Sequence, residues 1–193
     1  MVSKEDMLRF GLFGNVDPRK ELWAGISFYM GEKARWIPPY EEVCKWLSDN
    51  QGRGLISVGS CGLGKSLISM QVLPVLFKKH FGFDVMSMPA TEMNTRIDEV
   101  LAYCEPKHII IIDDLGAEPP ETVTFGNRRH PFCELVDKAE RTGALLIITT
   151  NLRTTKDDSI RHPSIEERYG IPTLDRLKAI TKVVLFTGQS LRG

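Results

Sequence analysis

The stretch Gly59–Ser66 constrains the fold of this chain more than any other part of the sequence. It reads Gly-Ser-Cys-Gly-Leu-Gly-Lys-Ser and fits the pattern GxxxxGK[ST] at every fixed position. An apolar strand pattern, Leu55–Val58, precedes it, and a helical pattern from Lys65 to about His80 follows it. In a strand–loop–helix unit of this kind, glycines let backbone N–H groups surround phosphate oxygens, and the helix adds the positive end of its dipole.

The sequence therefore predicts a phosphate-binding loop. Its residues are Gly59, Ser60, Cys61, Gly62, Leu63, Gly64, Lys65 and Ser66. Lys65 is expected to reach the β- and γ-phosphates of a bound nucleotide, and the hydroxyl of Ser66 is expected to ligate Mg²⁺.

After Gly54, strand and helix patterns alternate to the end of the chain. A run of four isoleucines, Ile109–Ile112, is typical of a strand that is buried on both faces. The alternation predicts an α/β fold in which helices cover a parallel sheet. The remaining strands are expected at Val85–Met88, Leu145–Thr149 and Val183–Phe186, and the helices at Glu92–Tyr103, Pro131–Arg141 and Leu174–Ile180.

Two carboxylates follow the isoleucine run directly. Because ligands of open α/β sheets bind at the carboxyl ends of the strands, Asp113 and Asp114 are expected to face the phosphate loop. Asp113 is predicted to hold Mg²⁺, directly or through water. Asp114 is predicted to orient or deprotonate the water that attacks the nucleotide.

Two further polar residues are candidates for the same site. Asn151 follows the strand Leu145–Thr149, where its side chain would hydrogen-bond water or the γ-phosphate; an ordinary turn asparagine is the alternative. Arg176 lies beyond that strand and would reach the γ-phosphate bound by a neighbouring subunit. Its alternative is a surface arginine paired with an acidic neighbour such as Asp175.

Residues 1–52 carry few strand signals, so we place a boundary there: a small, mostly helical N-terminal segment, and an ATPase core over residues 53–193. One helix is expected in the N-terminal segment, from about Pro39 to Asp49, because its apolar residues recur at helical spacing. Trp23, Phe28, Tyr29 and Trp36 form either a partner-binding patch or the packing of a small subdomain.

The bulk properties are those of an ordinary globular protein, with 42% hydrophobic and 26% charged residues in 193. No apolar run approaches the ~20 residues that span a bilayer. Charges near the N-terminus stand where a secretory signal would be apolar, so we expect a cytoplasmic protein. Residues 55–125 carry 5 basic and 9 acidic side chains, and residues 126–193 carry 12 and 8. The basic excess would suit nucleic acid or phosphates, or would simply be a solvated face.

These motifs, in this order, resemble the DnaC/IstB-like branch of the AAA+ ATPases, which includes replicative helicase loaders and transposition helpers. The resemblance runs from about Tyr40 to the C-terminus. It is carried by three stretches: Ile112–Glu118, Ile147–Leu152, and Arg168-Tyr169-Gly170 with Asp175-Arg176-Leu177. The closing stretch Phe186–Arg192 also looks like the end of that family.

The resemblance implies an AAA+ P-loop core with a five-stranded parallel sheet in the order 5-1-4-3-2. The sequence ends after the expected fifth strand, so no C-terminal helical lid is expected. The resemblance also implies that Asn151 is the first sensor and that Arg176 is the arginine finger. Its cofactors would be ATP and Mg²⁺. It further implies an N-terminal segment that grips a partner, a replicative helicase or a transposase, and a core that engages DNA, with single-stranded DNA favoured and an ATP-dependent homo-oligomer as the working form.

The leading hypothesis is a slow ATPase that loads or remodels a helicase or another DNA-bound assembly. The runner-up is an IstB-like transposition helper, which shares every motif and differs in its partner. A small-molecule P-loop kinase is a more remote alternative, because such kinases usually carry an arginine-rich lid over the phosphates and the sequence shows no such block before the sensor strand. A nucleotide switch that barely hydrolyses ATP is the last alternative.

Overall fold

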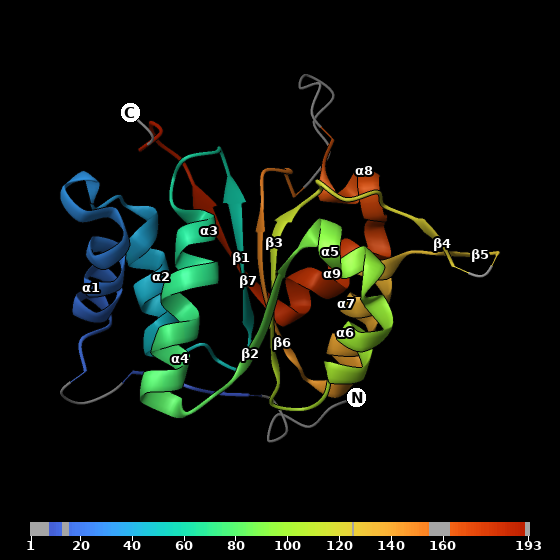
Figure 1. Ribbon diagram of the computed structural model, residues 1–193, viewed down its shortest axis with the longest axis horizontal. Helices are drawn as coiled ribbons and strands as arrows, with labels where there is room; N and C mark the ends of the chain where they lie inside the picture. Colours follow the sequence, from blue (N-terminus) through green and yellow to red (C-terminus); the bar gives the residue numbers. More distant parts are fainter. Residues whose placement is uncertain (1–7, 13–15, 125, 155–162, 192–193) are drawn as a thin grey trace.

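The centre of the chain is a sheet of five parallel strands (Figure 1). A computed structural model describes residues 8–12, 16–124, 126–154 and 163–191. The strands of this sheet are β1 (Gly54–Gly59), β2 (Val85–Pro89), β3 (Ile109–Leu115), β6 (Leu145–Thr150) and β7 (Thr181–Phe186). Their order is β2-β3-β6-β1-β7. Counted in chain order within the sheet, this is the expected order 5-1-4-3-2 read from the other edge, so the predicted fold class is confirmed.

Helices cover both faces of the sheet (Figure 1). On one face lie α1 (Pro18–Met30), α2 (Pro39–Ser48), α3 (Lys65–Leu67) and α4 (Leu73–Phe81), with a 3-10 turn η1 (Gly31–Lys33) and a π turn η2 (Ile68–Val72) between them. On the other lie α5 (Ala90–Thr95), α6 (Ile97–Tyr103), α7 (Pro131–Thr142), α8 (Ile165–Tyr169) and α9 (Ile171–Ile180).

The isoleucine run explains why both faces are covered. Side chains alternate along a strand, so Ile109 and Ile111 point into the apolar cluster beneath α2 and α4, while Ile110 and Ile112 point into the cluster beneath α6 and α7. All four are fully buried. A strand of this composition is stable only between two layers of helices.

The N-terminal helices share the core of the first face. Leu22 and Ile26 of α1 and Tyr40 and Leu47 of α2 belong to the same buried cluster as Phe77 of α4. Helix α1 was not expected from the sequence, although Asp17 caps it by accepting the N–H of Arg19, and Pro18 occupies its first turn. The predicted division at residues 52 and 53 falls just before β1, and the independence of the two segments stays a prediction.

Two helices differ from their predicted form. The helix expected from Lys65 to His80 contains the π turn η2, because Pro74 has no N–H to donate and its ring crowds the preceding turn. The helix expected over Glu92–Tyr103 is two helices, since Arg96 leaves the helical conformation. The guanidinium of Arg96 pairs with Glu92 on one side of the break and Glu99 on the other.

A short antiparallel hairpin was not predicted. It consists of β4 (Thr122–Thr124) and β5 (Asn127–Arg129), and it projects away from the sheet between β3 and α7 (Figure 1). None of the helices in the described part of the chain is long and apolar enough to cross a membrane. Arg192, the last residue of the stretch that resembles the family's end, lies outside the described residues.

Candidate functional site

The predicted phosphate loop connects the end of β1 to the start of α3. Gly62 and Gly64 have φ angles of 80° and 81°, which L side chains rarely adopt. A Cβ on Gly62 would lie 2.2 Å from the hydroxyl of Ser190, and one on Gly64 would lie 2.5 Å from the hydroxyl of Tyr40. The positive φ therefore favours glycine at both positions, and a side chain at either would also have to displace a neighbouring hydroxyl. Such a loop leaves backbone N–H groups free of side-chain cover, as phosphate binding demands.

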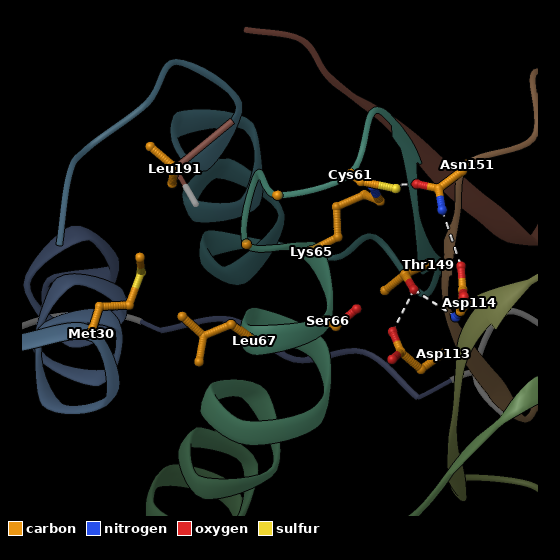
Figure 2. A pocket seen from close by; sticks show the side chains of 12 residues that line it. Met30, Cys61, Lys65, Ser66, Leu67, Asp113, Asp114, Thr149, Asn151 and Leu191 are labelled. Atoms are coloured by element: carbon orange, nitrogen blue, oxygen red, sulfur yellow. Dashed lines mark hydrogen bonds between the residues drawn. The ribbon is translucent and has the colours of Figure 1, made fainter. Parts of the chain in front are cut away.

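Lys65 is folded over this loop. Its side chain is buried, and Nζ donates hydrogen bonds to the carbonyl oxygens of Gly59 and Ser60, each at 2.7 Å. A third hydrogen bond, 2.9 Å long, goes to Oδ1 of Asn151 (Figure 2). The ammonium group thus lies between the phosphate loop and the end of β6.

The two aspartates emerge from an irregularity in β3. The register between β3 and β6 shifts between Ile112 and Leu115, and Asp114 has a φ angle of 55°. Aspartate is among the few residues other than glycine that adopt this left-handed conformation readily. The irregularity interrupts the regular alternation of side chains, and both carboxylates line the same pocket (Figure 2).

Thr149 and Asn151 connect these carboxylates to the rest of the site. Oγ1 of Thr149 donates to Oδ1 of Asp113 at 2.5 Å and accepts the backbone N–H of Asp114 at 2.9 Å. Nδ2 of Asn151 donates to Oδ1 of Asp114 at 3.1 Å. Since Asn151 also accepts from Lys65, a continuous chain of hydrogen bonds runs from the phosphate loop to Asp114.

The pocket that contains these groups has a volume of about 300 Å³ and two chemically different ends. One end is polar and holds Lys65, Ser66, both aspartates, Thr149 and Asn151. The other is apolar: Met30, Leu67 and Leu191 lie on the side of the loop away from the carboxylates (Figure 2). The polar end offers the hydroxyl of Ser66 and the carboxylate of Asp113, and such oxygen donors fit Mg²⁺.

Arg176 is not among the described residues that line this pocket. It lies on α9, where its guanidinium pairs with Asp137 at 2.7 Å and Glu140 at 3.2 Å, both on α7. The acidic partners therefore belong to another helix rather than to the sequence neighbour Asp175. The Arg176 side chain keeps 41% of its surface exposed.

Sequence reasoning missed five residues of the site, one of which, Leu67, directly follows the predicted loop. Thr149 could have been identified from the sequence, because it lies near the end of the same strand pattern that precedes Asn151. Met30, Leu191 and Tyr40 come from segments that no motif connects to the loop. Tyr40 donates to the carbonyl of Leu63 at 3.2 Å, and the N–H of Leu191 donates to the carbonyl of Gly62 at 2.8 Å. Both contacts support the phosphate loop from outside.

Comparison with solved structures shows which known proteins share the fold of this chain. The DnaC helicase loader is similar with a TM-score of 0.52 and 17% identity, over 91% of this chain and 94% of that one. DnaI is similar with a TM-score of 0.53 and 16% identity, and the match covers 100% of this chain and 95% of DnaI. A candidate primosome component from Streptococcus pyogenes serotype M3 is similar with a TM-score of 0.52 and 13% identity, and the match covers 94% of this chain and 87% of that one.

The chain has the fold of these proteins. The resemblance to the DnaC-type AAA+ branch, first indicated by the motifs, is thereby confirmed at the level of the fold. No family model matches the chain, and neither does any curated protein. Because the identities are low, the comparison leaves the roles of individual residues to be argued from the site itself.

Proposed function

We propose that this chain is an ATPase of the helicase-loader type, which binds ATP with Mg²⁺ and hydrolyses it slowly until it is assembled. The observation that carries the proposal is the pocket in which Lys65, Asn151 and Asp114 are joined by hydrogen bonds, with Asp113 and Ser66 beside them. These groups come from the carboxyl ends of the neighbouring parallel strands β3 and β6 and from helix α3, which follows β1. That edge of an α/β sheet is where phosphate ligands bind.

The phosphates would lie along the loop from Gly59 to Ser66. In this structure the ammonium of Lys65 donates hydrogen bonds to two backbone carbonyls and to Asn151. Phosphate oxygens, as anionic acceptors, make stronger hydrogen bonds than neutral carbonyls. Lys65 would therefore exchange these partners for the phosphates, and Asn151 would become available to a water or to the γ-phosphate.

Ser66 and Asp113 would hold Mg²⁺, which neutralises charge on the phosphate oxygens when it is bound. The hydroxyl of Thr149 fixes the Asp113 carboxylate and would act as a positioning group for that ligand. The carboxylate of Asp114 accepts a hydrogen bond from Asn151, and its side chain faces the pocket. It is the group that would orient or deprotonate the attacking water.

The base of the nucleotide would lie at the apolar end. Met30, Leu67 and Leu191 offer methyl and methylene groups, and apolar contact suits a planar base. The two ends of the pocket therefore match the two halves of a nucleoside triphosphate.

Arg176 would act on the ATP of a neighbouring subunit. Its contacts with Asp137 and Glu140 are solvent-exposed ion pairs, and such pairs contribute little to stability. The Arg176 guanidinium could therefore leave Asp137 and Glu140 for a phosphate bound on an adjoining subunit at a small cost in free energy. This arrangement makes a monomer slow and an assembly faster.

The partner would be a replicative helicase. The motifs and the fold both point to loaders, and DnaC is described as a helicase loader. Single-stranded DNA is the nucleic acid that we expect the assembly to engage. Affinity capture from the native host with ATP and Mg²⁺ separates this partner from the alternative: recovery of a helicase supports loading, and recovery of a transposase without a helicase supports a transposition helper.

Calorimetry and steady-state hydrolysis test the enzymatic part directly. We expect ATP to bind one site per chain in the presence of Mg²⁺, and turnover per subunit to rise with protein concentration. Absence of ATP binding would refute the proposal. Fast turnover that does not depend on concentration would refute the shared site.

A further inference from the structure

A buried carboxylate outside the pocket is not used by the proposed chemistry. Glu118 follows β3 in the turn that begins at Asp114, and only 1% of its surface is exposed. Burying a carboxylate is costly unless its oxygens receive hydrogen bonds. The Glu118 side chain receives one on each oxygen: Oε2 accepts the backbone N–H of Gly116 at 2.8 Å, and Oε1 accepts the hydroxyl of Tyr169.

Helix α8 supplies a second layer of contacts around this carboxylate. Nε of Arg168 donates to the hydroxyl of Tyr169 at 3.1 Å, and its Nη2 donates to the backbone carbonyl of Glu118. The guanidinium also lies 5.7 Å from the centre of the Tyr169 ring. The ring also packs against Phe132 of α7, with the ring centres 4.7 Å apart. Tyr169 is thus fixed by polar contacts at its hydroxyl and by apolar packing on its ring.

The backbone between Asp114 and Glu118 is the part of the chain that these contacts hold. Asp114 has a φ of 55° and Gly116 a φ of 106°, so two residues of one turn adopt conformations with positive φ. Aspartate tolerates this conformation better than most residues other than glycine, but it still costs energy, and surrounding contacts help to hold it. Within the turn, the N–H of Ala117 donates to the carbonyl of Asp114 at 3.1 Å, and Glu118 secures the N–H of Gly116.

We propose that Glu118, Tyr169 and Arg168 position Asp114 for hydrolysis. Glu118 fixes the turn, and α8 fixes Glu118. The effect on hydrolysis rests on the proposed function, while the effect on the turn does not. The same contacts tie Asp114 to the segment that continues through Gly170 into α9, the helix that carries Arg176. Two of the three stretches that carry the resemblance, Ile112–Glu118 and the one that begins with Arg168-Tyr169-Gly170, therefore meet in one cluster.

The variant Tyr169→Phe tests the proposal, because it removes the hydroxyl and keeps the ring on Phe132. Tyr103→Phe is the matched control: its hydroxyl donates to the carbonyl of Asp84 at 3.3 Å, in the loop between α4 and β2. Three quantities are measured in each variant: the amide hydrogen exchange of Gly116 by NMR, the ATP dissociation constant and kcat.

In Tyr169→Phe we expect the Gly116 amide to exchange roughly fivefold faster or more, which is the change that the loss of one supporting hydrogen bond produces. We expect kcat to fall roughly tenfold with the ATP dissociation constant unchanged. Tyr103→Phe should leave all three quantities as in the wild type. Unchanged ATP affinity also shows that the variant is folded.

A second variant, Glu118→Gln, keeps the size of the side chain but replaces one acceptor oxygen with a donor. It should show the same changes as Tyr169→Phe. Unchanged Gly116 exchange in both variants overturns the role in the turn, and faster exchange with an unchanged kcat overturns the role in positioning Asp114. If the wild type hydrolyses no ATP, the proposed function fails, and Gly116 exchange alone decides whether the cluster holds the turn.

Discussion

Thr149 occupies a central place among the residues of the site. One hydroxyl donates to the carboxylate of Asp113 and accepts the N–H of Asp114. The side chain therefore sets the orientation of the predicted metal ligand Asp113. It also supports the backbone of Asp114, the predicted general base. A valine would keep the shape of Thr149 and lose both hydrogen bonds.

In Thr149→Val we expect the Mg²⁺ concentration for half-maximal hydrolysis to rise roughly tenfold, because loss of a group that orients a metal ligand weakens metal binding by about that factor. A titration of ATPase activity with Mg²⁺ measures the effect. Thr149→Ser retains the hydroxyl and should stay near the wild type. Equal Mg²⁺ requirements in the valine variant and the wild type would show that Thr149 does not orient Asp113.

Lys65→Ala should weaken ATP binding roughly 10- to 100-fold, since a hydrogen-bonded charge on the phosphates is lost. Calorimetry gives the dissociation constant. Lys78→Ala is the matched control, because Lys78 pairs with Asp84 at 2.8 Å on the surface of α4. If both variants bound ATP as the wild type does, the loop from Gly59 to Ser66 would not be the nucleotide site.

At the scale of elements, the strands and the polar end of the pocket were predictable, and the supporting contacts were not. The isoleucine run identified β3, and the rule that ligands bind at the carboxyl ends of parallel strands placed Asp113, Asp114 and Asn151 together. The hairpin β4–β5 was missed because its residues, Thr-Val-Thr and Asn-Arg-Arg, carry no core pattern. The contribution of Leu191 was missed because it depends on tertiary packing between distant segments.

Helix α2 contributes to the site through one phenol. Tyr40 is fully buried, and its hydroxyl donates to the carbonyl of Leu63 inside the phosphate loop. Burial raises the pKa of this hydroxyl to about 12. The neutral phenol therefore contributes to stability below pH ~10, the value for an unfolded tyrosine, and this contribution is lost as the pH rises from there toward the folded pKa.

Tyr40→Phe should lower the free energy of unfolding by about 1 kcal/mol at pH 8, the usual effect of one lost hydrogen bond. Because phenylalanine has no proton to lose, the difference between wild type and variant should shrink between pH 10 and 12. Urea unfolding at pH 8 and pH 11 measures it, and the other tyrosines, common to both proteins, cancel in the comparison. A difference that stays constant with pH would contradict the role assigned to the Tyr40 hydroxyl.

For the whole molecule, the account requires more than one subunit. Asp114 lies in the pocket of its own chain, while Arg176 lies on α9 outside it and pairs with α7. A complete site would therefore take Asp114 from one subunit and Arg176 from the next. Both faces of the central sheet are covered by helices of the same chain, so assembly would use exposed groups such as Arg176 rather than the sheet itself.

Asp114→Ala and Arg176→Ala should each bind ATP normally and each lose stimulated hydrolysis. A mixture of the two should recover part of the activity, because some interfaces then combine an intact Asp114 with an intact Arg176. Hydrolysis by each variant and by the mixture, at equal total protein concentration, provides the comparison. A mixture no more active than its components would remove Arg176 from the shared site.

The most direct test of the account is a crystal structure with a non-hydrolysable ATP analogue and Mn²⁺ in place of Mg²⁺. We predict that the triphosphate lies along Gly59–Ser66 with Lys65 turned from Asn151 to the phosphates. An anomalous peak from Mn²⁺ should lie between Ser66 and Asp113, with the base against Met30, Leu67 and Leu191. A nucleotide bound elsewhere, or a metal ion away from Asp113, would contradict the claim that the loop and the two aspartates act on one triphosphate.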